Sequence, residues 1–292
     1  MPLFQGSGVA LATPFTETGI DFEALGRLVD FQLAGGTDAL VVAGTTGEPS
    51  TLEEGEYEAL VRFVVERADK RVPVIAGAGS NSTRHAIALS RQAQRLGVDG
   101  LLHVTPYYNK TTHAGLLAHF TAIAEAVDMP IIVYNVPVRT GLNMKPETLV
   151  ALAGTRNIHA VKEASGDLSQ VTDIARLCGD KLAIYSGIDE IILPVLSVGG
   201  VGVISVVANI APRETHDLVA KFLAGDVAGA QQLQWRLKPL VDALFTETSP
   251  IPVKAALEWM SICPARARLP LVPIGEAAAK RLQAEMKAFG LI

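Results

Sequence analysis

The chain has 292 residues, of which 49% are hydrophobic and 19% charged, which suits one large domain or two modest ones with a sizeable core. Its net charge of -5, with scattered lysines and arginines, argues against a nucleic-acid-binding surface. No apolar run reaches the roughly 18 residues of a membrane span, and the first residues lack a secretion signal. Two cysteines cannot form a disulfide framework, so we expect a cytoplasmic protein.

Short apolar runs rich in β-branched residues alternate with longer amphipathic stretches. The eight runs are residues 8–12, 39–42, 73–76, 100–104, 130–134, 158–162, 182–185 and 201–204. Continuous apolarity is typical of parallel strands that are covered on both faces. Helical spacing follows Asp21, an expected N-cap, and Ser82, which opens a stretch ending at Gly97; Pro212 lies where a first helical turn would begin.

A strand followed by a helix, repeated eight times, predicts an α/β fold of the (β/α)8 TIM barrel class over residues 1–224. An open, doubly wound sheet is the alternative, but the eight runs are similarly apolar and none is an obvious edge strand, which favours closure. After about Gly225 the strand pattern stops. Three helical stretches, 227–244, 253–260 and 274–289, predict a C-terminal helical extension at 225–292, an appendage rather than a separate functional domain.

Functional groups of a barrel lie at the carboxyl ends of its strands, where this sequence repeatedly places polar residues. Lys162 is the most unusual because it ends an apolar run. Burial would lower its pKa below the usual value of about 10.4 and leave a neutral amine that can form a Schiff base with a carbonyl compound. The ordinary alternative is a lysine that extends to solvent or pairs with a carboxylate. Glu163 should point to the opposite face of the strand.

Tyr134 ends the preceding run at the matching position. Neighbouring strands lie about 4.8 Å apart, so its phenol could meet Lys162 and move protons, although a rim tyrosine bonded to backbone is the commoner case. The turn at 44–47, with two glycines flanking Thr45 and Thr46, suits a small carboxylate or phosphate, or is an ordinary βα loop. Arg139 could bind a carboxylate through two hydrogen bonds, or form a surface ion pair.

Other chemistries lack their residues. The six histidines show no HExxH or paired metal-ligand spacing, so we expect no catalytic metal. The sequence has no GxSxG and no P-loop, and the glycines at 77 and 79 lack the third glycine of a dinucleotide-binding fingerprint. The residues therefore give no sign of a catalytic zinc, a P-loop or a dinucleotide-binding site.

Four segments occur together in one order: Gly-Thr-Thr-Gly-Glu at 44–48, Thr-Pro-Tyr-Tyr-Asn at 105–109, Tyr-Asn-Val-Pro-x-Arg-Thr-Gly at 134–141 and Val-Lys-Glu-Ala at 161–164. Together they resemble the dihydrodipicolinate synthase family of pyruvate-dependent class I aldolases, which includes N-acetylneuraminate lyase. The resemblance runs from about Gly8 to Ser205, and the helical tail fits. It implies a lyase that condenses pyruvate with L-aspartate 4-semialdehyde to 4-hydroxy-tetrahydrodipicolinate, the first committed step of diaminopimelate and lysine biosynthesis.

The resemblance also implies roles for the proton-transfer residues. Lys162 would form a Schiff base with the keto carbon of pyruvate, and Tyr134 would be the general acid and base. Thr45 would link Tyr134 to Tyr108, which in the family comes from the neighbouring subunit. Activity would then need at least a dimer, and the family is commonly a dimer of dimers.

The remaining roles concern substrate binding. By the same resemblance, Thr46 would hold the carboxylate of pyruvate, and Arg139 would bind the carboxylate of the semialdehyde. Gly187 and Ile204 would contribute backbone groups to the pyruvate pocket. The resemblance implies that no metal or organic cofactor takes part, because the protonated imine accepts the electrons.

Lysine-inhibited members of the family share an allosteric cleft beside a tight dimer contact. The matching positions here are Pro49, Ser50, Glu54, Tyr57, Asn81, His85 and Tyr107. Asn81 and Tyr107 match. Glu54 and Tyr57 replace histidines, and His85 replaces a glutamate, so a bound lysine would lose a carboxylate at 85 and could gain one at 54. We expect weak or absent feedback by lysine.

Rival functions share part of this pattern. An N-acetylneuraminate lyase or a 2-keto-3-deoxy sugar acid aldolase would use the same Schiff base with another acceptor, but Arg139 and the Thr45–Tyr108 pair favour the synthase. A non-catalytic barrel that binds pyruvate or lysine would need no proton relay. A metal-dependent aldolase would be inactivated by a chelator, which we do not expect.

Overall fold

The computed structural model describes residues 2–292, apart from the side chain of Glu54. Eight parallel strands pair in sequence order and close into a barrel, because the first pairs with the last. They are β1 (Gly6–Ala10), β2 (Ala39–Val42), β3 (Val74–Gly77), β4 (Gly100–Val104), β5 (Ile131–Asn135), β6 (Ile158–Glu163), β7 (Ala183–Ser186) and β8 (Gly202–Ser205). The closed sheet confirms the predicted barrel and excludes the open, doubly wound alternative.

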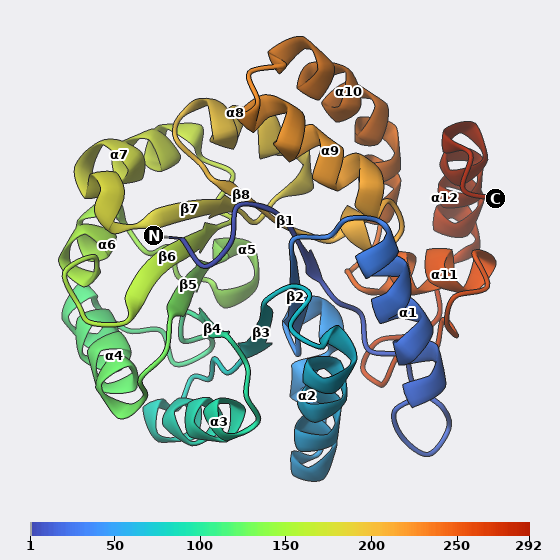
Figure 1. Ribbon diagram of the computed structural model, residues 1–292. Coiled ribbons are helices and arrows are strands. Elements are labelled where there is room, and N and C mark those ends of the chain that lie inside the picture. The colour runs from blue at the N-terminus through green and yellow to red at the C-terminus, as the bar shows by residue number, and fades with distance from the viewer. Residues whose placement is uncertain (1) are drawn as a thin grey trace.

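One helix follows each strand and covers the outside of the barrel (Figure 1). These helices are α1 (Phe22–Ala34), α2 (Glu54–Ala68), α3 (Thr83–Arg95), α4 (His113–Ala126), α6 (Pro146–Leu152), α7 (Leu168–Cys178), α8 (Ile192–Ser197) and α9 (Pro212–Leu223). The short α5 (Pro137–Thr140) lies in the loop after β5. Asp21 and Ser82 accept the predicted capping hydrogen bonds of α1 and α3, and Pro212 begins α9.

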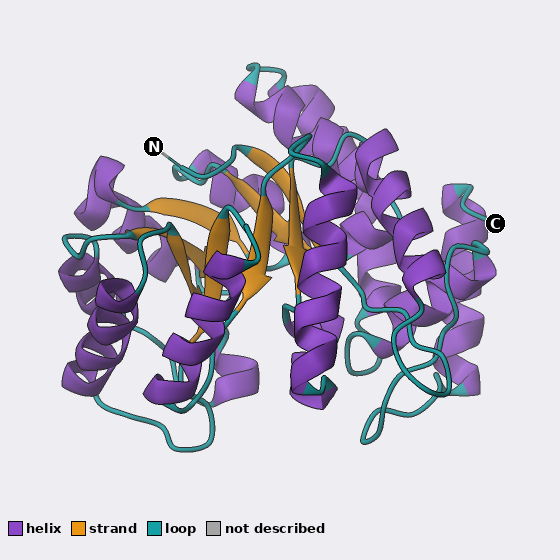
Figure 2. Ribbon diagram, turned by 60° about the horizontal axis from the view of Figure 1, so that its bottom comes forward, coloured by secondary structure: helices purple, strands orange, loops and turns teal. Residues whose placement is uncertain are grey.

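Three helices form the C-terminal extension: α10 (Val227–Leu244), α11 (Ile251–Trp259) and α12 (Glu276–Phe289). α10 packs against α9 and α12, and the group lies on one side of the barrel, outside α9 and α1 (Figures 1 and 2). None of the helices among residues 2–292 combines the length and apolarity that a membrane crossing needs.

Several boundaries differ from the sequence prediction by one or two residues, and two of these differences have a plain physical reason. β1 occupies Gly6–Ala10 rather than 8–12, because its ladder with β8 begins at the Gly6–Gly202 pair, and Ala12 donates its N–H to the side chain of Asn209 instead of a strand. α11 begins at Ile251 rather than at 253, because a proline is tolerated in the first turn of a helix.

The apolar residues form two cores, separated by the sheet. The larger lies between the strands and the helices, and the smaller fills the barrel. Phe4, from the segment before β1, enters the smaller core, where its ring stacks on Tyr185 with centroids 4.4 Å apart. The hydroxyl of Tyr185 also donates to the carbonyl of Phe4 over 2.6 Å. The barrel interior is therefore packed, and polar side chains gather where the strands end.

Candidate active site

Lys162 lies on β6, one residue before the strand ends, and its side chain is only 5% exposed. This burial excludes the solvent-extended lysine that the sequence had left open. Desolvation and, to a smaller extent, the charge of Arg139 lower the pKa of Lys162, the carboxylate of Asp189 opposes the shift, and the net pKa is about 8. A substantial fraction of the amine is therefore neutral, and nucleophilic, near neutral pH.

Tyr134 is the register partner of Lys162 across β5 and β6, as the strand pattern predicted. The Nζ atom of Lys162 lies 4.2 Å from the centre of the Tyr134 ring, and the tyrosine is 6% exposed. Burial raises the pKa of Tyr134 to about 12, with the charge of Arg139 and a hydrogen bond with Thr45 acting in the opposite direction. The phenol thus keeps its proton at neutral pH and can donate it to a group bound at Lys162.

Glu163 points away from the barrel interior, as expected from strand alternation. Its carboxylate accepts hydrogen bonds from the side chain of Asn135 at 3.0 Å and from the N–H of Ser165 at 2.7 Å. Burial raises the pKa of Glu163, and these hydrogen bonds counteract the shift. The carboxylate of Glu163 is therefore bound on the outer side of the strand, by Asn135 and Ser165.

The turn that carries Thr45 and Thr46 is a single 3₁₀ turn, Thr45–Gly47, directly after β2. Thr46 is buried and Thr45 is half-buried. The hydroxyl of Thr13 donates to the carbonyl of Gly47 over 2.8 Å. A Cβ atom at Gly47 would lie 3.1 Å from that hydroxyl oxygen, so the glycine permits the close approach.

Arg139 lies on α5, at the carboxyl end of the barrel, and is exposed. One of its terminal nitrogens donates to the carbonyl of Ser249, in the C-terminal extension, over 3.0 Å. Among the side chains that the structure describes, no carboxylate forms a salt bridge with it, so the surface ion pair is not observed there. Its positive charge lowers the pKa of both Lys162 and Tyr134.

Gly187 and Ile204 complete the surroundings of Lys162. A Cβ atom at Gly187, which follows β7, would lie 3.1 Å from Cε of Lys162. The glycine therefore avoids a close contact with the side chain of Lys162. Ile204 lies on β8, and its side chain belongs to the core inside the barrel together with Tyr134. Tyr108, in the loop after β4, is 92% exposed and has a left-handed φ of 67°.

Sequence reasoning missed Asp189, a buried carboxylate that lies two residues after Gly187. It accepts hydrogen bonds from the N–H groups of Val206 at 3.0 Å and Val207 at 2.9 Å, which join the loop after β7 to the loop after β8. Burial raises the pKa of Asp189, and its charge favours the protonated form of Lys162. Its place shortly after a strand end was the signal in the sequence.

The candidate allosteric residues lie in and around the loops after β2, β3 and β4. Ser50 and His85 are exposed, and Tyr107 is partly exposed. The buried hydroxyl of Tyr57 donates to the carbonyl of Gly77 over 3.0 Å, and the carbonyl of Asn81 accepts from the side chain of Asn109. Glu54 begins α2, but its side chain lies outside the described part of the structure. Within that part, no group of three or more His, Cys, Asp or Glu is arranged to hold a metal ion.

Known proteins resemble this chain in sequence and in fold. The model of the dihydrodipicolinate synthetase family matches residues 3–289. The 4-hydroxy-tetrahydrodipicolinate synthase of Caldicellulosiruptor saccharolyticus is 57% identical, over 100% of this chain and 99% of its own length. The dihydrodipicolinate synthase structure from Thermotoga maritima superposes with a TM-score of 0.98 at 43% identity, and covers all of both chains.

A second solved structure adds a ligand. The chloride-inhibited dihydrodipicolinate synthase from Acinetobacter baumannii, complexed with pyruvate, has a TM-score of 0.97 and 43% identity, and the match covers 99% of each chain. Sequence, closed barrel and family model lead to one conclusion: the chain belongs to the dihydrodipicolinate synthetase family.

Proposed function

We propose that this chain is a lyase that condenses pyruvate with L-aspartate 4-semialdehyde to 4-hydroxy-tetrahydrodipicolinate, on the route to diaminopimelate and lysine. One observation carries the proposal: the buried amine of Lys162, with a pKa of about 8, lies 4.2 Å from the centre of the Tyr134 ring at the end of the barrel. The names of the relatives and the pyruvate complex of the Acinetobacter baumannii enzyme support the reaction and its first substrate.

The first half-reaction forms an imine. The neutral Nζ of Lys162 attacks C2 of pyruvate, and the carbonyl oxygen leaves as water after it has received two protons. Tyr134, whose pKa of about 12 keeps it protonated, donates and recovers protons at this atom. Thr45 hydrogen-bonds Tyr134, while Thr46 in the same turn holds the carboxylate of pyruvate.

The second half-reaction uses the imine as an electron sink. Loss of a proton from C3 of the bound pyruvate moves an electron pair onto the imine nitrogen and gives an enamine, whose C3 attacks the aldehyde carbon of the semialdehyde. The aldehyde oxygen takes up a proton. The amino group of the semialdehyde then attacks C2, closes the ring and displaces the amine of Lys162, so the overall reaction releases one water molecule for each product formed.

Two charged groups flank this chemistry. Arg139 binds the carboxylate of the incoming semialdehyde, since a guanidinium offers two parallel hydrogen bonds to a carboxylate. Asp189 balances the positive charge of the protonated imine on Lys162, because its charge already acts on that nitrogen. Gly187 and the backbone at Ile204 line the pocket for pyruvate.

We also infer that the working unit is at least a dimer, and a dimer of dimers by analogy with the family. Tyr108 is nearly fully exposed, and its neighbour Tyr107 and the α5 residue Val138 are exposed as well. A tyrosine in this position can enter the site of a second copy and complete the relay from Tyr134 through Thr45. For the compartment we propose the cytoplasm, because Cys178 and Cys263 are both buried free thiols.

Borohydride reduction in the presence of pyruvate tests the proposal. We expect a reduced pyruvyl group on Lys162, identified by peptide mass spectrometry, and no label in Lys162→Ala. An adduct at another residue, or none, would overturn the mechanism. Condensation with L-aspartate 4-semialdehyde is then compared with cleavage of N-acetylneuraminate. Cleavage without condensation would assign the chain to the sugar-acid lyases instead.

A further inference from the structure

One lysine of the C-terminal extension is fully buried in the interior of the molecule. Lys254 lies on α11 and is 0% exposed. Its Nζ lies 2.5 Å from Oε1 of Glu48, donates to the carbonyl of Thr13 over 2.9 Å, and lies 4.4 Å from the centre of the Phe15 ring. Burial lowers the pKa of Lys254, while the attraction of Glu48 opposes this shift. Because a buried ion pair depends on its geometry, the ammonium of Lys254 fixes the carboxylate of Glu48 and the carbonyl of Thr13 in place.

Those atoms belong to the turn that carries Thr45 and Thr46. Glu48 follows the turn directly and has a left-handed backbone, with φ 54° and ψ 48°; Ala43, on its other side, has φ 53°. Non-glycine residues avoid this region, and such residues persist where the surroundings hold them. The N–H of Glu48 also donates to the carbonyl of Thr45 over 3.2 Å and closes the turn.

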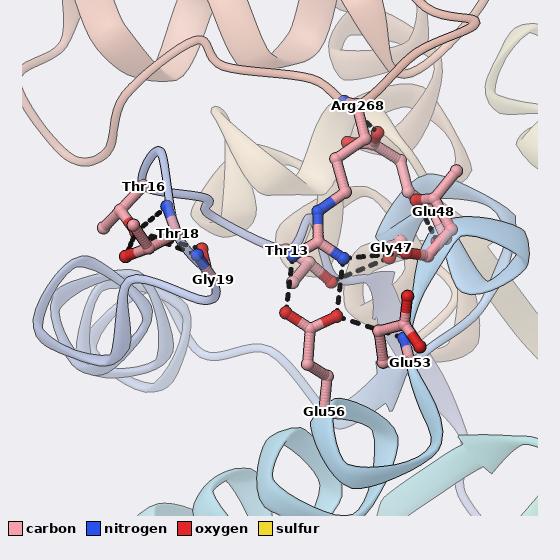
Figure 3. A network of polar contacts seen from close by, with 10 residues as sticks. Thr13, Thr16, Thr18, Gly19, Gly47, Glu48, Glu53, Glu56 and Arg268 are labelled. Atoms are coloured by element: carbon pink, nitrogen blue, oxygen red, sulfur yellow. Dashed lines mark hydrogen bonds and ion pairs between the residues drawn. The ribbon is translucent and has the colours of Figure 1, made fainter.

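A second residue of the extension acts on the same turn. Arg268 donates its N–H to Oε2 of Glu48 over 3.0 Å, and its guanidinium binds the carbonyl of Thr51 at 2.7 Å and the carboxylate of Glu56. Figure 3 shows Arg268 reaching from the C-terminal segment to Glu56 and to the turn at Glu48. Both carboxylate oxygens of Glu48 are thus bound by the extension.

Thr13 links the lysine to the other side of the turn. Its carbonyl accepts from Lys254, and its hydroxyl donates to the carbonyl of Gly47 over 2.8 Å. The turn is therefore fixed from both sides by groups that meet at one ammonium. We propose that Lys254 is a positioning residue, which holds Thr45 and Thr46 at the mouth of the barrel in the geometry that binds pyruvate and passes protons to Tyr134.

This inference rests on the proposed function, because it concerns the residues that handle pyruvate. It also revises the expectation that residues 225–292 are an appendage: the division at residue 225 remains a prediction, but the extension becomes a working part of the active site. The extension also contacts Arg139, the residue proposed to bind the semialdehyde, because the guanidinium donates a hydrogen bond to the carbonyl of Ser249.

The test separates positioning from stability. Lys254→Met leaves the charge of Glu48 buried and unpaired, so we expect a lower melting temperature. The double variant Glu48→Gln, Lys254→Met removes both charges, and we expect most of the melting temperature to return. In both variants we expect the KM for pyruvate to rise by roughly tenfold or more, with kcat less affected, since small displacements of a binding group have large effects.

Two controls accompany these variants. Leu282→Ala opens a cavity in α12 without touching the turn, and Arg266→Gln removes a surface ion pair between the extension and Glu17. We expect Leu282→Ala to lower the melting temperature and both controls to keep the wild-type KM for pyruvate. The same samples are quenched with borohydride at graded pyruvate concentrations, which reports imine formation without the second substrate.

The outcomes are distinct. A wild-type enzyme that forms no adduct with pyruvate refutes the proposed function. A wild type that forms the adduct, with a double variant that has a normal KM, refutes the positioning role alone. The role is also refuted if KM follows the melting temperature across all variants, controls included, or if the double variant fails to fold, because the pair would then be required for stability.

Discussion

Lys162 combines two opposing requirements, because its amine must be buried to become nucleophilic and yet must carry a positive charge once the imine has formed. Burial and Arg139 favour the neutral amine, and Asp189 favours the cation. The pKa of about 8 is the balance between these influences. The chemistry therefore depends on charged residues from three separate segments: the end of β6, the short helix α5 and the segment after β7.

The rate of imine formation should follow the titration of Lys162. Only the neutral amine attacks pyruvate, so below the pKa of about 8 we expect the rate to fall with decreasing pH, and above it to level off. Well below the pKa of Lys162, the rate of imine formation should fall about tenfold for each unit by which the pH decreases. Borohydride quenching of single turnovers across the pH range measures this dependence. A rate that is independent of pH between 6 and 8 would contradict it.

Substituting the two flanking charges should move this titration in opposite directions. Asp189→Asn removes an anion that favours the cationic lysine, so the pKa of Lys162 should fall and the rising limb should shift to lower pH. Arg139→Ala removes a cation, so the limb should shift to higher pH. Single-turnover profiles for both variants provide the measurement, with the exposed Asp180→Asn as control. Shifts in the same direction would show that the charges do not act through Lys162.

At this scale the sequence predicted the central pair but not its charged surroundings. Lys162 and Tyr134 are recognisable because each is a polar residue that ends an apolar run. Arg139 was a candidate carboxylate binder from its place in the loop after the fifth strand, whereas the roles of Thr45 and Tyr108 came from the family resemblance. Lys254 stands in an otherwise apolar helical stretch, but the sequence could not reveal its partner, because Glu48 is 206 residues away in the chain. Only tertiary structure brings such residues together.

Among the elements, β3 shows how closely the loops at the mouth are packed. A Cβ atom at Gly77, the last residue of β3, would lie 2.0 Å from the carbonyl oxygen of Ala43, just before the turn of Thr45 and Thr46. We expect Gly77→Ala to reduce the free energy of unfolding by about 1–3 kcal/mol, as overpacking does, and to reduce turnover because the turn must move. Urea unfolding and steady-state assays measure these effects.

Gly26→Ala is the matched control for that substitution. Gly26 lies inside α1, and its Cβ would make ordinary contact with Phe63 at 3.5 Å. Alanine is the better helix former by about 0.5–1 kcal/mol, so this variant should be as stable as the wild type or more stable, with normal turnover. Equal losses in both variants would show that the added methyl group at Gly77 does not act through the turn.

The elements themselves were largely predictable because two periodicities are visible in the sequence. Continuous apolar runs gave all eight strands, and the capping residues Asp21 and Ser82 marked helix starts. The boundaries of β1 and α11 were not predictable, because a strand ends where its neighbour stops pairing and a proline is tolerated in a first helical turn. The sequence of a single segment does not reveal which strand it will pair with or how far the pairing extends.

At the scale of the whole molecule, Tyr108 predicts complementation between subunits. Tyr108→Phe should slow turnover but still allow imine formation, and Lys162→Ala should be inactive. In a mixed dimer, one site keeps both its own Lys162 and the partner's Tyr108. Remixed equal amounts of the two variants should therefore recover roughly a quarter of the wild-type rate. Unchanged turnover in Tyr108→Phe, or no recovery on mixing, would contradict a shared site.

Feedback by lysine also belongs to this scale. The phenol of Tyr57 is buried and engaged with the carbonyl of Gly77, and His85 stands where inhibited relatives have a carboxylate. A lysine ligand would therefore find few groups here that complement its ammonium, and we expect weak or absent inhibition. Steady-state assays with added lysine provide the measurement, and strong inhibition at low millimolar lysine would refute the expectation.

The burial of Lys254 has a consequence for synthesis of the polypeptide. By the time residue 205 has left the ribosome, all eight strands and Lys162 have been made, but the ammonium that grips Glu48 has not. A barrel that folds on the ribosome would thus contain Lys162 before the turn of Thr45 and Thr46 is held in place by the C-terminal helices. The site would become able to react with a keto acid only after the final helices have been made. Chemical activity would therefore depend on completion of translation.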